Sequence, residues 1–218
     1  GVDQFVANLR KARYRGIVGI NLGKNKDTPI ERAAGDYAAS LEKVYPLAHF
    51  ATINISSPNT ADLRRLQSPE HLAPLLAAMH GLRERLAQKH GRRVALAVKI
   101  APDIDDSGIA TLARIAVEQH MDAIIATNTT VSRVRVQGMP HADEPGGLSG
   151  APLRELATEV VRKLARAVDG ALPIIGVGGI MTAEHAREKL AAGATLLQLY
   201  CGLVYRGPGV VGDIVNAL

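Results

Sequence analysis

Residues 50–60 read FATINISSPNT, an apolar run that ends abruptly in amides and hydroxyls. The segment from Phe50 to Ile55 has the β-branched and aromatic composition of a buried strand. From Asn54 to Thr60 follow two asparagines and two adjacent serines, all of which need hydrogen-bond partners. This segment by itself fits a ligand site or an ordinary turn, because Ser, Pro and Asn are also the residues that turns prefer.

The same form, an apolar run with a polar or glycine-rich end, recurs along the chain. Further strands are expected over residues 16–22, 94–100, 122–127, 173–177 and 195–200. Helices are expected over residues 2–15, 29–44, 69–89, 102–120, 153–168 and 182–192, and after Pro208. Strands that alternate with helices, and that are apolar enough to be covered on both faces, predict a parallel α/β protein.

Two parallel architectures compete, an open doubly wound sheet and a closed (β/α)₈ barrel. No Gly-x-Gly-x-x-Gly motif opens a helix, as a dinucleotide-binding first turn requires. Functional-looking groups instead end all six expected strands, which is typical of a barrel whose site is built from its strand-to-helix loops. We predict one domain over residues 1–218, a TIM barrel with about six of its eight β/α units, the first two lying outside this chain.

Composition narrows the classes of partner and ligand. The chain has 218 residues, 47% of them hydrophobic, which suffices for one sizeable core. The net charge of +5 would allow an acidic partner, but aromatic residues are only 3%, so we expect no nucleic acid. The seven histidines show no metal-ligand spacing, and no metal site is predicted. No apolar run reaches the roughly 18 residues of a membrane span.

Glycines end the last two expected strands. In a barrel, a phosphate group commonly binds the loops after these strands, and glycine lets the backbone approach its oxygens. Gly178-Gly179 and Cys201-Gly202 occupy these places and favour a phosphate site over simple tight turns. The stretch 131–150 is long for a connection without regular structure, and we expect a functional lid or a disordered segment there.

Lys99 interrupts an apolar strand one residue before its end. A lysine there is costly to bury unless it meets an anion or loses its charge. It suits a Schiff-base nucleophile, or a cation that stabilises negative charge on a cofactor ring. The third reading is a lysine that snorkels to the strand edge. Position in the sequence does not choose between the two chemical roles.

Six motifs, taken together and in order, give a specific resemblance that covers essentially the whole chain. They are GINLGKN at 19–25, NISSPNT at 54–60, KIAPD at 99–103, ATNTT at 126–130, GGLSG at 146–150 and GVGGI at 176–180. With them the chain resembles a dihydroorotate dehydrogenase. It is most similar to the class 2, quinone-linked group, because Ser57 stands where class 1 enzymes carry cysteine.

The resemblance implies an FMN enzyme that oxidises (S)-dihydroorotate to orotate in pyrimidine synthesis and passes the electrons to a quinone. Ser57 would take the proton from C5 of the substrate while hydride leaves C6 for the flavin, with Thr60 and a water as candidates for its proton relay. The substrate contacts implied are Asn54, Asn59, Asn128 and Thr129. The cofactor contacts implied are Asn21, Asn54, Lys99, Thr127, Gly150, Gly179, Tyr200 and Cys201.

Cys201 departs from the small hydroxyl residue expected at its place. The family further implies N-terminal helices that form the quinone site and contact the inner membrane from its cytoplasmic side, and we expect a monomer. Two alternatives remain, a phosphate-binding barrel lyase or isomerase that uses Lys99, and a non-catalytic barrel fragment. The presence of both Ser57 and Lys99 speaks against the fragment.

Overall fold

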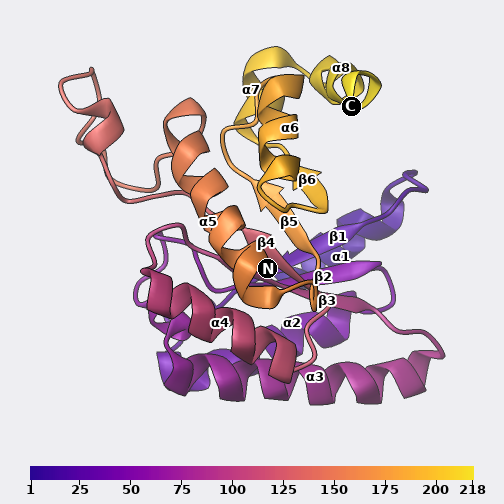
Figure 1. The fold of residues 1–218 in the computed structure, drawn as a ribbon. Coiled ribbons are helices and arrows are strands. Elements are labelled where there is room, and N and C mark those ends of the chain that lie inside the picture. Colours follow the sequence, from indigo (N-terminus) through magenta and orange to yellow (C-terminus); the bar gives the residue numbers. More distant parts are fainter.

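The computed structural model describes residues 1–218, in which six strands form a single parallel sheet. The strands follow one another in chain order from β1 to β6, and every neighbouring pair is parallel. They are β1 (Gly19–Leu22), β2 (Phe50–Asn54), β3 (Ala95–Ile100), β4 (Ala123–Ala126), β5 (Ile174–Val177) and β6 (Leu196–Gln198). The sheet curls (Figure 1), which makes the structure an incomplete (β/α) barrel.

Helices connect the strands and pack side by side on the outside of the curled sheet (Figure 1). The α-helices are α1 (Val2–Lys11), α2 (Ala33–Val44), α3 (Pro69–His90), α4 (Asp106–Glu118), α5 (Arg154–Val168), α6 (Ala183–Ala191), α7 (Cys201–Arg206) and α8 (Gly209–Ala217). Short 3₁₀ turns are η1 (Ile30–Arg32), η2 (Leu63–Gln67), η3 (Val134–Val136) and η4 (Ala151–Leu153). None of the helices is both long enough and apolar enough to cross a bilayer.

The period-2 alternation of the strands separates two apolar layers. Side chains on the outer face, such as Leu96, Val98 and Ile124, join a core of 39 buried residues beneath the helices. Side chains on the inner face form a separate cluster of five residues, Ala97, Ala123, Ile125, Ile175 and Val177. Both faces of the sheet are therefore packed, which explains why the strands read as continuous apolar runs.

The expected elements agree closely with the observed ones, and the differences have local causes. The helix expected over 29–44 begins as the 3₁₀ turn η1 and becomes α-helical at Ala33. Two starts are fixed by side-chain caps, since Asp105 accepts from the Gly108 N–H and Thr182 accepts from the His185 N–H. The six-residue α7 was not expected, because it is too short to show helical periodicity.

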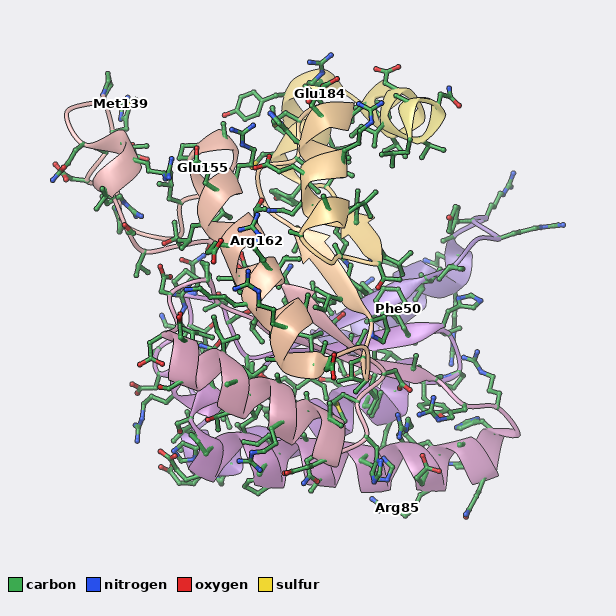
Figure 2. All side chains as sticks on the ribbon, in the orientation of Figure 1. Phe50, Arg85, Met139, Glu155, Arg162 and Glu184 are labelled. Atoms are coloured by element: carbon green, nitrogen blue, oxygen red, sulfur yellow. The ribbon has the colours of Figure 1, made fainter.

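The segment 131–147 forms a lobe that projects from the body of the protein, with Met139 at its far end (Figure 2). Two backbone hydrogen bonds of 3.0 and 2.8 Å between Thr130 and Leu148 join the two chain segments at the base of the lobe. Arg133 donates to the carbonyls of Glu144 and Gly146 across the lobe. These contacts favour the functional lid, of the two expectations for this segment, over the disordered one.

Candidate functional site

The carboxyl end of β2 joins the end of β4 through side-chain hydrogen bonds. The Asn54 Oδ1 atom accepts from the Ser56 N–H at 3.2 Å, from the Ser56 hydroxyl at 2.7 Å and from the Asn128 amide at 3.4 Å. The Tyr37 hydroxyl donates a hydrogen bond to the Asn54 backbone carbonyl at 2.7 Å and so fixes the main chain at this residue. With its oxygen occupied, the Asn54 side chain presents N–H donors to a ligand, which suits a carbonyl or carboxylate oxygen.

Ser56 lies at the centre of this network and is fully buried. Its hydroxyl donates to Asn54 and accepts from the Asn128 amide at 3.0 Å, while Asn128 Oδ1 accepts from the Thr129 N–H at 2.8 Å. The sequence analysis named both asparagines but missed Ser56. Only its depth distinguishes it from Ser57, and adjacent serines in a strand end give no signal of which one is buried.

Ser57 is half-buried, and its side chain makes no hydrogen bond to that network. Its Oγ atom accepts from the Asn59 N–H at 3.2 Å, and no hydrogen bond joins it to Thr60. The glycines at the end of the lobe approach this loop closely. A Cβ atom on Gly147 would lie 2.9 Å from the Pro58 ring and within 1.8 Å of the Thr129 hydroxyl oxygen. Gly147 therefore packs between the Thr129 side chain and the Pro58 ring, where a side chain would not fit.

Lys99 lies beside Asn54 on the inner face of the sheet, since strand register pairs these residues. Its ammonium has no hydrogen-bond or ion-pair partner within the chain, and burial lowers its pKa below the ordinary value. An unpartnered cation in this position is a ready binding group for an electron-rich ring atom or an anion.

A cavity of about 250 Å³ lies between the ends of β3 to β6, and most predicted cofactor residues line it. The predicted cofactor residues that line it are Lys99, Thr127, Gly150, Gly179, Tyr200 and Cys201, and the predicted substrate residues Asn128 and Thr129 line it as well. Asn54 does not line the cavity but reaches it through its hydrogen bond with Asn128. Asn21 lies on β1, away from this cavity, and its role stays a prediction. Lining residues that the sequence analysis missed include Ser149 and Gln198. Gln198 had a signal, because it is a polar residue in a strand that was read as apolar.

The far wall of the cavity is made of backbone. Gly178 and Gly179 have φ angles of +115° and +72°, in the region that glycine adopts without strain. A Cβ atom on Gly179 would lie 2.4 Å from the Arg154 Cβ and 2.5 Å from its Cα. The N–H groups of both glycines have no acceptor within the chain. Free backbone donors in a tight turn are a typical binding site for phosphate oxygens.

Cys201 lies at this wall, where its Sγ atom is 2.9 Å from the Ser149 hydroxyl. The Cys201 thiol therefore makes a hydrogen bond at the position where a small hydroxyl residue was expected. No group of His, Cys, Asp and Glu in the chain has the arrangement of a metal site.

A curled parallel sheet with a cavity at the carboxyl ends of its strands defines a (β/α)-barrel protein with a small-molecule site. The family model described as dihydroorotate dehydrogenase matches residues 1–218. The chain is 58% identical over its full length to the dihydroorotate dehydrogenase (quinone) of Burkholderia multivorans, and 57% to that of Thiobacillus denitrificans. It covers 63% and 65% of these relatives.

Solved structures agree. The chain superposes on DHODH from Eimeria tenella in complex with ferulenol with a TM-score of 0.88 at 34% identity, covering 100% of this chain and 61% of that one. The ligand-free type from the same organism gives 0.86 at 33% identity, covering 99% of this chain and 63% of that one. The chain belongs to the dihydroorotate dehydrogenase family. This family is flavin-dependent.

Proposed function

We propose that the protein containing this chain oxidises (S)-dihydroorotate to orotate with FMN as cofactor and a quinone as electron acceptor. The observation that carries the proposal is the pairing of an unpartnered Lys99 ammonium with unpartnered glycine N–H groups around one cavity, beside the loop of Ser57. These residues fit a flavin nucleotide, which carries an electron-rich ring and a phosphate. Bound FMN supplies the hydride acceptor of the reaction.

Each group of this chain then has a task that its contacts support. Ser57 takes the proton from C5 of the substrate. Asn54 directs N–H donors at the site because its oxygen is held by Ser56 and Asn128. Asn59, Asn128 and Thr129 hold the carboxylate and ring amides of dihydroorotate. Lys99 offsets negative charge as the oxidation proceeds, since a buried cation acts strongly where water is scarce.

The remaining cofactor contacts divide between ring and phosphate. Asn21, Thr127 and Asn54 contact the ring system, and Gly150, Gly179, Tyr200 and Cys201 complete the ring and phosphate contacts. Gly179 supports this role best, because its N–H has no acceptor within the chain, and its φ of +72° and close approach to Arg154 allow only glycine there.

The complete protein is a single barrel domain that adds two β/α units to the six of this chain. In support, β1 and β6 each have one unpaired edge, and the relatives are longer than the chain. Further helices outside the chain form the quinone site and bind the inner membrane peripherally from the cytoplasmic side. The protein acts as a monomer. The names of the relatives support the quinone as acceptor.

The test is the absorbance spectrum of the full-length protein under anaerobic conditions. Addition of dihydroorotate should bleach the flavin band with release of orotate, and a soluble quinone should restore the band. Absence of flavin, or a band that dihydroorotate leaves unchanged, would overturn the proposal. Borohydride trapping of a substrate on Lys99 in such a sample would favour the lyase or isomerase instead.

A further inference from the structure

The 3₁₀ turn η2 lies across the carboxyl ends of three strands, although its sequence reads as an ordinary loop with two arginines. Leu63 and Leu66 anchor it, because both side chains are 2% exposed within the main core. Gln67 ties it to the end of β3, where its Oε1 atom accepts from the Ala101 N–H at 2.8 Å. Arg64 points from this anchored turn toward the site.

The Arg64 guanidinium holds three loops at once. Its Nε atom donates to the Ser56 carbonyl at 3.0 Å, after β2. One terminal nitrogen donates to Asp103 at 2.7 Å, after β3, and the other to the Thr129 carbonyl at 2.7 Å, after β4. The first of these carbonyls belongs to the peptide that precedes Ser57.

Asp103 extends the connection to the lobe. Its carboxylate accepts from the Thr130 hydroxyl and from the Val131 N–H at 3.1 Å, where the lobe begins. The Arg64 and Asp103 side chains are each 22% exposed, so solvent screens their ion pair only in part. Charge-assisted hydrogen bonds of this kind are stronger and more directional than neutral ones.

We propose that Arg64, paired with Asp103, is a positioning residue that sets the distance and angle between the Ser57 loop and the Thr129 segment. The inference rests on the proposed function, because it assigns the base to one loop and substrate contacts to the other. Arginine is required because a planar fork can donate in three directions, whereas the lysine ammonium is a point charge on a flexible stem. A displacement of about 1 Å between reacting groups costs roughly 100-fold in rate.

The experiment uses the full-length flavoprotein and compares Arg64→Ala and Arg64→Lys with wild type by anaerobic stopped-flow absorbance. Arg65→Ala is the matched control, because Arg65 is exposed and its side chain has no hydrogen-bond partner. We expect flavin reduction by dihydroorotate to be about 100-fold slower in Arg64→Ala, with flavin content and reoxidation by quinone unchanged. Millimolar guanidinium should restore part of the rate in Arg64→Ala, and lysine should not replace arginine fully.

If the Arg64 variants fail to fold, Asp103→Asn provides a second test of the proposal. This variant should slow flavin reduction by dihydroorotate, by a smaller factor than Arg64→Ala. Reduction at the wild-type rate in Arg64→Ala overturns the proposal, and so does an equal loss of both half-reactions together with flavin. If wild type itself is not bleached by dihydroorotate, the proposed function has failed. If wild type bleaches and all variants match it, only the positioning role has failed.

Discussion

The two halves of the candidate site are built by different means. At the ends of β2 to β4, which we call the side-chain half, Asn54, Ser56 and Asn128 hydrogen-bond to one another and Lys99 adds a charge. At the ends of β5 and β6, the backbone half, Gly178, Gly179 and Gly202 expose main chain at the wall.

This difference separates chemistry from anchorage. Proton transfer needs reacting groups at fixed positions, and the hydrogen bonds among Asn54, Ser56 and Asn128 fix the strand end that leads into the Ser57 loop. Binding a phosphate needs close approach and N–H donors, and side chains at these glycines would collide with Leu153, Arg154 or Ile180 and displace the main chain that supplies the donors. Substitutions in the two halves should therefore damage different steps.

The largest effect is expected in the side-chain half, from Ser57→Ala. Removal of the base should slow flavin reduction by about 10³-fold, within the range usual for general base catalysis, while the flavin stays bound. Anaerobic stopped-flow absorbance measures both quantities. Ser132→Ala, in the exposed lobe, is the control and should behave as wild type. Flavin reduction at the normal rate in Ser57→Ala would show that another residue is the base.

A smaller effect of the opposite kind is expected in the backbone half, from Gly179→Ala. The new Cβ would overlap Arg154, and the φ of +72° adds strain, so flavin affinity should fall about 10-fold or more. Flavin per protein measures this loss, and the reduction rate of the flavin that remains should be near normal. Gly207→Ala is the control, since its φ is +74° but nothing lies within 4 Å of the added atom. Equal losses in both variants would point to strain alone.

The smallest effect concerns the support beneath the backbone half. Lys189 is buried, donates to the Arg154 carbonyl and the Thr158 hydroxyl, and burial lowers its pKa from 10.5 to about 8. Between these pH values the unfolded chain binds more protons at this position than the folded one, so the free energy of unfolding rises with pH in that window. The contribution is about 1.4 kcal/mol per pH unit at most.

Urea unfolding between pH 8 and 10 measures that slope in wild type and in Lys189→Met. The slope should be smaller in the variant, because methionine has no proton to release. Lys89→Met, at an exposed position, should retain the wild-type slope. Equal slopes in all three proteins would mean that Lys189 carries its charge in the folded state.

Much of the fold follows from local pattern. Six apolar runs and the helices between them were predicted close to their observed bounds, because period and capping act within a few residues. The α7 helix was not predicted, because it is too short to show a helical pattern. The sequence left the order of the lobe open, because its hydrogen bonds join residues far apart in the loop.

For the site, the sequence by itself determined which residue types end each strand, including Ser57, Lys99 and the paired glycines. It determined the family as well, through six ordered motifs. Only the tertiary structure decided which groups meet. Ser56 reaches Asn128 across 72 residues, and Arg64 reaches Asp103 and Thr129 across 39 and 65. The reason is that parallel strands bring their carboxyl ends to one edge, and hydrogen bonds there depend on distances that no local pattern encodes.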